Sequence, residues 1–333
     1  MKKLIIISND KLYFDNNSVR SNFNDTINII EGLSKKNHLN FFCRKTSAKG
    51  IHKTIVTKKS QLKISQIKLL DLNVQKILMI SITPYNYIIF AILIFFHKKI
   101  DGFVILRSDG FKEYEAKFGF FGKKVYEILF KKVLKKLKPI VVTNQISNLK
   151  DYDYDKINPS EITNQWKKNL KKPNLKKANL LYIGRIRREK GVYSLLKLIT
   201  NFSINYKLSI VGQKKKKFFT DKNIKFYSET SKVKKIISFY DKNNIFILPS
   251  YTEGYPKVIL ESLSRLRPVI VFNEISHVKK NLKGIFITQR NANDLQKTIK
   301  YILKNYTKIQ SQIRKNKILS KKKFQSDLVK LIK

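Results

Sequence analysis

Two glutamates, Glu253 and Glu261, stand eight residues apart with a glycine and a proline between them. An apolar run over residues 245–248 precedes them. Pro256 suits the first position of a helix, where its missing N–H costs nothing. This order places Glu253 where a strand ends and Glu261 in the second turn of the next helix, at the sheet edge where open α/β folds bind ligands.

Such a site suits a sugar nucleotide. The free N–H groups near a helix start and the helix dipole favour a diphosphate, while carboxylates accept hydrogen bonds from sugar and ribose hydroxyls. The alternative is an acidic helix start followed by a solvated glutamate. The strand–loop–proline context favours the sugar-nucleotide site, with Gly254, Tyr255 and Pro256 forming the donor-binding turn.

A basic loop occupies residues 184–191 in the same half of the chain. It follows the apolar run 180–183 and precedes a helical pattern that begins near Val192. Arg185 and Lys190 are predicted to face a diphosphate leaving group, because fixed cations stabilise the negative charge that grows there in the transition state. The alternative is an ordinary solvated loop.

The first half has a weaker candidate directly after the apolar run 102–106. Arg107 and Asp109 would lie at a carboxyl edge of a sheet, where they can position an acceptor or the donor's β-phosphate. A turn with a local arginine–aspartate pair explains the same residues equally well.

Metal and disulfide chemistry are not expected. The Asp-x-Asp pattern in residues 151–155 falls in the polar segment 151–177, which interrupts the strand–helix alternation, so we predict no metal site. His277 stands alone and is expected to be structural. Cys43 is the only cysteine, which excludes an internal disulfide and suits a reducing, cytoplasmic compartment.

Short β-branched runs alternate with helical patterns such as 231–240 and 291–304. Most runs are continuously apolar, as in parallel strands covered on both faces, so the sequence predicts an α/β fold with doubly wound sheets. The strands expected in the first half are 4–8, 40–43, 77–82, 102–106 and 140–143. Those expected in the second half are 180–183, 207–211, 224–227, 245–248, 269–272 and 285–288.

The 333 residues suffice for two domains. We expect an N-terminal Rossmann-like domain over residues 1–165, a polar linker over 166–177, and a second Rossmann-like domain over 178–305. The helical segment 306–333 is expected to return to the first domain.

One stretch, residues 77–96, is almost long and apolar enough to cross a membrane. Pro84 divides it and Lys98 follows it closely. The alternative to a membrane span is therefore a buried strand, a turn and a core helix over 85–96.

The formal net charge of +47 attracts polyanions, although a compositional bias toward lysine explains it equally well. Lysine greatly outnumbers arginine, whereas nucleic-acid readers favour arginine, so nucleic acid is not the expected partner. Residues 123–138 form a predicted helix with seven lysines beside one apolar face, which holds Val125, Ile128, Leu129, Val133, Leu134 and Leu137. This helix either lies on an anionic membrane or faces the core.

The two motifs together resemble the retaining glycosyltransferases of family 4, which have the GT-B fold of two Rossmann-like domains facing across a cleft. The basic loop is similar to that family's G-R-x-x-x-E-K-G donor loop, and residues 253–261 are similar to its E-G-F-P-x-x-x-L-E motif. Gly212 matches a glycine at a strand end, as Gly184 does at the start of the donor loop.

The resemblance implies that Arg185 and Lys190 hold the donor phosphates, that Glu261 holds the ribose and that Glu253 holds the transferred sugar. It implies a metal-independent, hexosyl-type transferase without a cofactor, acting on a nucleotide-sugar and a glycan or lipid-linked acceptor in polysaccharide synthesis. The expected location is the cytoplasm, peripheral on the inner face of the membrane. A nucleic-acid-binding protein and a non-catalytic peripheral membrane module are the competing hypotheses.

The chain departs from the family's pattern at two places. Leu266 stands where the family often has glycine, and Arg267 follows it. The family often has a glycine-rich loop after the first strand, whereas this chain has Asn-Asp-Lys-Leu at 9–12 and no glycine before Gly32.

Overall fold

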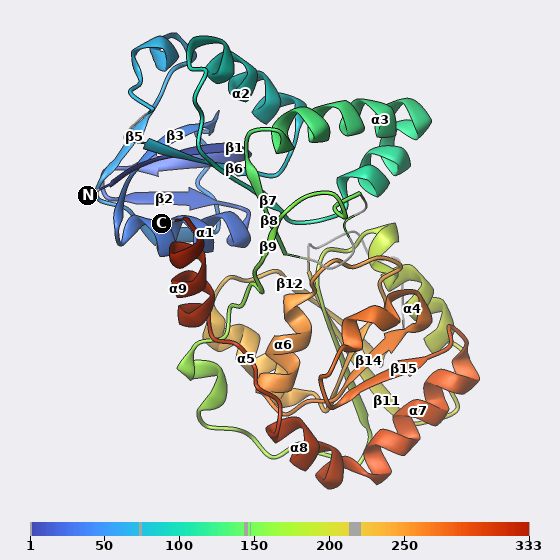
Figure 1. The fold of residues 1–333 in the computed structure, drawn as a ribbon. Helices are drawn as coiled ribbons and strands as arrows, with labels where there is room; N and C mark the ends of the chain where they lie inside the picture. The colour runs from blue at the N-terminus through green and yellow to red at the C-terminus, as the bar shows by residue number, and fades with distance from the viewer. Residues whose placement is uncertain (1, 73–74, 143–145, 147, 213–220, 333) are drawn as a thin grey trace. The chain divides into compact units, whose positions relative to one another are not determined.

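The computed structural model describes residues 2–72, 75–142, 146, 148–212 and 221–332. The chain forms two compact units, the first made of residues 1–159 with 321–333 and the second of residues 160–320. Each unit has its own sheet with helices packed around it (Figure 1).

The sheet of the second unit consists of parallel strands. Their spatial order is β12 (Ile224–Ser228), β11 (Tyr206–Gly212), β10 (Ala178–Ile183), β13 (Ile245–Leu248), β14 (Val269–Phe272) and β15 (Ile285–Thr288). The order reverses between β10 and β13, and this switch point is where doubly wound sheets bind ligands. β13 and β14 are buried at every position, which explains their continuously apolar sequences.

Amphipathic helices surround this sheet. They are α4 (Val192–Ile199), α5 (Val233–Lys242), α6 (Lys257–Ser264), α7 (Ala292–Lys304) and α8 (Tyr306–Arg314). The connection from β10 to α4 passes through a short 3-10 helix, Arg188–Lys190, and the connection from β13 to α6 passes through Glu253 and Pro256. Both connections leave the carboxyl ends of the two strands that flank the switch point.

The first unit has a second parallel sheet. Its order is β5 (Lys59–Gln61), β3 (Asn37–Lys45), β1 (Lys2–Asp15), β6 (Gln75–Ile80), β7 (Gly102–Leu106), β8 (Lys138–Val141) and β9 (Asp155–Lys156). β1 continues past an irregularity between Ser8 and Lys11 and pairs antiparallel with β2 (Ser18–Ser21), which pairs with β4 (His52–Ile55).

The helices of the first unit are α1 (Asn24–Ser34), α2 (Pro84–Phe96), α3 (Gly110–Leu134) and α9 (Lys321–Ile332). The apolar stretch 77–96 is a buried strand, a turn and α2, whose N-cap Thr83 accepts a hydrogen bond from Asn86 N at 3.2 Å. Within the described part of the chain, every helix is too short or too polar to cross a bilayer.

The predicted fold class is confirmed, and several predicted strands match closely. The ranges 102–106, 245–248, 269–272 and 285–288 coincide with β7, β13, β14 and β15. The strand predicted at 140–143 ends at Val141, and Thr143 lies outside the described residues. β2, β4, β5 and α1 were not predicted, because their short or mixed sequences carry no apolar run.

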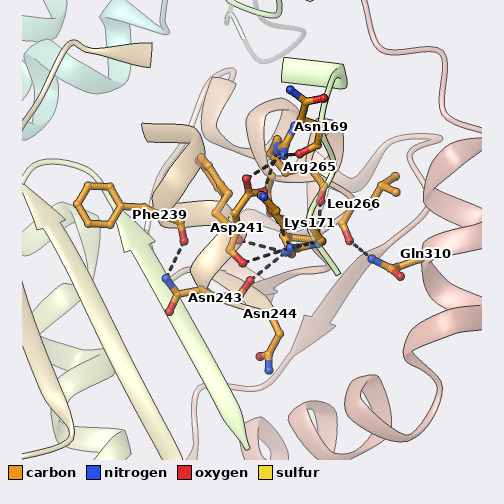
Figure 2. Close-up of polar contacts among 12 residues, drawn as sticks. Asn169, Lys171, Phe239, Asp241, Asn243, Asn244, Arg265, Leu266 and Gln310 are labelled. Carbon is orange, nitrogen blue, oxygen red and sulfur yellow. Dashed lines mark hydrogen bonds and ion pairs between the residues drawn. The ribbon is translucent and has the colours of Figure 1, made fainter. Parts of the chain in front are cut away.

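The predicted linker over 166–177 differs most from the structure. Trp166 is buried in the core of the second unit, and two buried arginines, Arg265 and Arg267, bind the segment through its carbonyls. Figure 2 shows Arg265 beside Asn169 and Asp241. Arg265 donates to the carbonyls of Trp166, Lys168 and Asn169 at 2.7–2.9 Å. Residues 160–177 therefore belong to the second unit.

The same two arginines meet around Asp241, which faces Arg265 at 2.9 Å. Arg267 donates to the carbonyls of Lys171 at 2.8 Å and Asn243 at 2.9 Å. Leu266, between them, has a φ of 55°, which explains why a glycine suits this position. A residue other than glycine thus holds a left-handed backbone at this position.

The C-terminal segment divides between the units. α8 packs on the second unit through Tyr306, Ile309 and Ile313, whereas α9 belongs to the first unit. Lys321, at the start of α9, forms a 2.7 Å ion pair with Glu31 of α1. The expectation that 306–333 returns as a whole therefore applies to α9 and not to α8.

Candidate functional site

The two predicted motifs lie against each other at the carboxyl ends of β10 and β13. Tyr251 N donates to the carbonyl of Glu189 at 3.0 Å. Gly191 has a φ of 65°, and a Cβ there would lie 1.8 Å from the carbonyl oxygen of Pro249. The glycine that ends the basic loop thus permits a close approach that any side chain would prevent.

An ion pair joins the two motifs. Lys190 Nζ lies 2.7 Å from Glu253 Oε1, with 20% and 11% of the two side chains exposed. Ser250 Oγ donates to the same carboxylate oxygen at 2.6 Å. Within the described chain, the other oxygen, Oε2, accepts no hydrogen bond, so it is available to a ligand hydroxyl.

Arg185 lies on the same loop as Lys190, has an exposed side chain and has no partner among the described residues. Its position is fixed through the backbone, because Tyr182 donates its hydroxyl to the carbonyl of Arg185 at 2.8 Å. A fixed backbone with a free guanidinium is suited to binding an anion that arrives from solution.

Gly184 and Gly212 meet where β10 and β11 end. Gly184 N donates to Val211 O at 3.0 Å, and a Cβ on Gly212 would lie 2.3 Å from the carbonyl oxygen of Gly184. These two glycines therefore let the backbone turns at the strand ends pack closely, which shapes the base of the site.

Glu261 lies in the second turn of α6, as predicted, and is partly buried. Its Oε2 accepts the hydroxyl of Tyr240 at 3.0 Å. Burial raises the pKa of Glu261 to about 7; the nearby Glu161 carboxylate adds to the rise, while Tyr240 and Lys257 oppose it. Lys257 forms an ion pair with Glu161.

Residues from other parts of the second unit contact the turn between the two glutamates. Pro256 is the N-cap of α6, whereas it was predicted to be the first residue of the helix. Its carbonyl accepts a hydrogen bond from Ile259 N at 3.1 Å. Lys280 Nζ lies 5.0 Å from the centre of the Tyr255 ring. His277 Nε2 donates to the carbonyl of Glu253 at 2.9 Å, since a carbonyl can only accept. Gly254, which lies between Glu253 and Tyr255 in the sequence, is half-buried.

Arg290 was not predicted from the sequence, and it contacts the loop that leads from β13 to Glu253. Its guanidinium lies between the rings of Tyr251 at 4.0 Å and Phe272 at 4.3 Å. It also donates to Glu274 at 2.6 Å and to the carbonyl of Ser250 at 3.3 Å. The available signal was its place after the predicted strand 285–288, where a cation can reach the sheet edge.

In the first unit, Arg107 pairs with Asp10 and not with Asp109. Arg107 Nη1 lies 3.3 Å from Asp10 Oδ2 and 3.2 Å from Thr26 Oγ1, and Nε donates to Ser81 Oγ at 2.9 Å. Thr26 also donates to Asp10. The alternative of a local arginine–aspartate pair is therefore wrong.

Asp109 has a structural contact of its own. It is the N-cap of α3 and accepts a hydrogen bond from Phe111 N at 3.1 Å.

A cavity of about 760 Å³ lies beside α3, and Phe111 and Tyr152 are among the residues that line it. Of the described residues that line it, none is a predicted site residue.

The aspartates of the Asp-x-Asp pattern face a lysine. Lys138 lies 2.9 Å from Asp153 and 3.3 Å from Asp155. No group of three or more possible metal ligands occurs among the residues that the structure describes.

The comparisons with known proteins match the second unit to glycosyl transferases. Residues 163–319 match the family model of glycosyl transferases group 1. Over 113 residues the chain is 29% identical to the capsular polysaccharide biosynthesis glycosyltransferase CapM of Staphylococcus aureus. This match covers 31% of the chain and 30% of CapM, so the chain matches under a third of that relative's length.

Solved structures are similar over nearly the whole chain. Sucrose-phosphate synthase of Thermosynechococcus elongatus superposes with a TM-score of 0.70 at 14% identity, covering 99% of this chain and 98% of that one. HepE of Anabaena, solved with UDP-glucose, gives a TM-score of 0.70 at 11% identity with 99% of both chains covered. The chain therefore has the GT-B fold, and its residues 163–319 match the group 1 glycosyl transferases.

Proposed function

We propose that the protein is a retaining glycosyltransferase of family 4, which moves a hexosyl group from a nucleotide-sugar to a glycan or lipid-linked acceptor. The observation that carries the proposal is the pairing of Lys190 with Glu253, together with Arg185 on the same loop, which has no partner among the described residues. Three charged groups at a sheet's switch point match the mixed polarity of a sugar diphosphate.

The cations act on the leaving group. When the bond between the sugar and the diphosphate breaks, negative charge grows on the departing phosphate oxygen. Arg185 and Lys190 stabilise that charge, and because their backbones are fixed, little reorganisation is needed during the reaction. In this proposal the two side chains supply positive charge that a metal ion supplies in other transferases.

The glutamates recognise hydroxyls. Glu253 Oε2 accepts from a hydroxyl of the transferred sugar, while Lys190 and Ser250 orient the carboxylate through Oε1. Glu261 holds the ribose, with Tyr240 fixing its carboxyl. Gly184, Gly212 and Gly254, with Tyr255 and Pro256, shape the surface on which the nucleotide lies.

The first unit is proposed to bind the acceptor, and Arg107 is proposed to support the sheet edge there through its contacts with Asp10 and Ser81. Synthesis of a cell-surface polysaccharide is the proposed setting, because the name of the relative CapM states capsular polysaccharide biosynthesis. The proposed location is the cytoplasm, with contact to an anionic membrane surface through the lysine-rich segment 123–138.

A panel of nucleotide-sugars tests the proposal. One member should raise the melting temperature of the wild-type protein, and Arg185→Ala should abolish that shift while Arg188→Ala, on the same exposed loop, should keep it. The responding donor is then incubated with acceptor glycans and the anomeric configuration of the product is read by NMR. No stabilisation by any donor, or a product of inverted configuration, would contradict the proposal.

A further inference from the structure

An unusual aromatic segment interrupts α3. Phe118, Phe120 and Phe121 are 64%, 64% and 82% exposed, although phenylalanine is usually buried. Gly119 between them has a φ of 65° and breaks the helix, so that α3 consists of two segments meeting at an angle (Figure 1). We call residues 118–121 the aromatic tip.

The glycines make this break possible. The backbone of Gly119 adopts a conformation that other residues rarely reach. Gly122 is buried, and a Cβ there would lie 2.6 Å from the carbonyl oxygen of Tyr114 in the segment before the break. The tip is therefore a feature built into the fold, with aromatic side chains on a sharp turn.

The outward apolar surface continues along the second segment of α3. Phe121, Val125 and Ile128 share one helix face at four- and three-residue spacing, and Val125 and Ile128 are 49% and 54% exposed. The opposite face, including Phe130 and Val133, is buried in the core of the first unit. The helix therefore has a complete core-facing side, and the exposed stripe is an additional apolar surface.

The prediction of one apolar face in 123–138 was thus wrong in detail. Leu129 and Val133 pack in the core, whereas Val125 and Ile128 lie on the stripe that begins at the tip.

Positive charge surrounds the stripe. Residues 110–138 contain nine lysines against three glutamates. The glutamates pair with some of them, for example Glu127 with Lys124 and Lys131. Lys132, Lys135 and Lys136 are exposed and have no carboxylate partner within the described part of the chain.

We propose that the aromatic tip inserts into the headgroup region of an anionic phospholipid bilayer, with the lysines of α3 lying against the lipid phosphates. Phenylalanines on a turn, flanked by lysines, are the side chains that such an interface accepts. A second copy of this chain is a poorer occupant, because lysine-rich surfaces on a protein of charge +47 repel each other. This inference rests on the membrane contact of the proposed function. It places that contact at the aromatic tip, which precedes residues 123–138 in the sequence.

Vesicle binding of the full chain, without donor or acceptor, tests this inference separately from sugar transfer. Vesicles of phosphatidylcholine with phosphatidylglycerol should bind the protein, and pure phosphatidylcholine should bind it weakly. Replacing Phe120 and Phe121 by serine should reduce the partition coefficient about tenfold or more. Because both side chains are exposed, the melting temperature should stay unchanged.

Phe95 provides a matched control, since it is 80% exposed on α2. Phe95→Ser should keep vesicle binding. Phe121→Trp should show a blue-shifted emission on anionic vesicles, against a constant background from the buried Trp166, and Phe95→Trp should not.

Three results would overturn the inference. They are an equal loss of binding in the Phe95 and Phe120/Phe121 variants, no blue shift of the tryptophan at 121, and a tip-dependent dimer without vesicle binding. Vesicle binding with no measurable glycosyl transfer would support the tip and contradict only the enzymatic proposal.

Discussion

Both units hold a partly buried ion pair at the carboxyl edge of the sheet, and these two pairs are similar in several ways. Arg107 and Asp10 in the first unit are 3.3 Å apart with 25% and 10% of their side chains exposed. Lys190 and Glu253 in the second are 2.7 Å apart with 20% and 11% exposed. A serine hydroxyl contacts a member of each pair.

The pairs differ in what they leave unsatisfied. Arg107 contacts Ser81, Thr26 and Asp10, and Thr26 also donates to Asp10, so the first cluster is closed on itself. In the second cluster both donors meet one oxygen of Glu253, and the neighbouring Arg185 has no partner within the described ranges. The same sheet edge thus supports a self-satisfied network in one unit and a ligand-ready one in the other.

The comparison predicts that Lys190→Met affects catalysis far more than folding. The transfer rate should fall about 10²–10³-fold, because a fixed cation at the leaving group is lost. Initial rates with saturating donor measure the effect. Thermal melting should change less than the transfer rate, because Glu253 keeps the hydroxyl of Ser250 as a hydrogen-bond partner.

Lys197, an exposed lysine on α4 close in sequence, provides the control. Lys197→Met should keep the wild-type rate. If Lys190→Met were as active as Lys197→Met, the open cluster would have no role in the reaction.

Arg107→Met should show the opposite pattern. It leaves the buried Asp10 without its cation, so the free energy of unfolding should fall by about 1–3 kcal/mol. Arg107→Lys restores the charge but not the forked donors, so it should recover part of this loss. Urea titration measures both. A large loss of transfer rate at unchanged stability would instead make Arg107 part of an open acceptor site.

This contrast also shows what the sequence could reveal. The apolar strands β7, β13, β14 and β15 were predictable, and both Lys190 and Glu253 follow such strands, so their meeting at one edge was expected. The closing partners were not predictable. Asp10 lies 97 residues from Arg107 along the chain, and only the pairing of β1, β6 and β7 brings them together.

The linker was mispredicted for a related reason. Lysine pairs and prolines in 166–177 indicate an exposed connection, yet its backbone carbonyls satisfy Arg265 and Arg267, which no local pattern indicates. Short polar strands such as β5 likewise depend on their neighbours and not on an apolar run.

Arg290 allows the open cluster to be disturbed without removing a group proposed to touch the donor. Arg290→Lys should lower kcat/KM about tenfold, because an ammonium cannot stack flat between Tyr251 and Phe272 while also reaching Ser250. Arg290→Gln should lower it further. Rates at several donor concentrations measure the loss, which should appear mainly in kcat if Arg290 positions Glu253. An equal rate in all three proteins would show that the loops hold their positions without it.

The smallest expected effect concerns pH, and it should arise in the second unit through Glu261. Its folded pKa of about 7 exceeds the ordinary value of 4.5, so the stability that its protonated form contributes is fully present below pH 4.5 and is lost as the pH rises through 7. Donor affinity should change in the opposite direction and rise several-fold through pH 7, because the ionised carboxyl accepts ribose hydroxyls better.

Two variants assign this titration to Glu261. Glu261→Gln should remove both pH dependences, leaving weak donor binding at every pH. Glu161→Gln should move the midpoint of donor binding to lower pH, because it removes the neighbouring carboxylate that helps raise the pKa of Glu261. Isothermal titration of the stabilising donor across pH 5–8 measures both. A midpoint that stays in place in Glu261→Gln would assign the titration to another group and leave Glu261 as a packing partner of Tyr240.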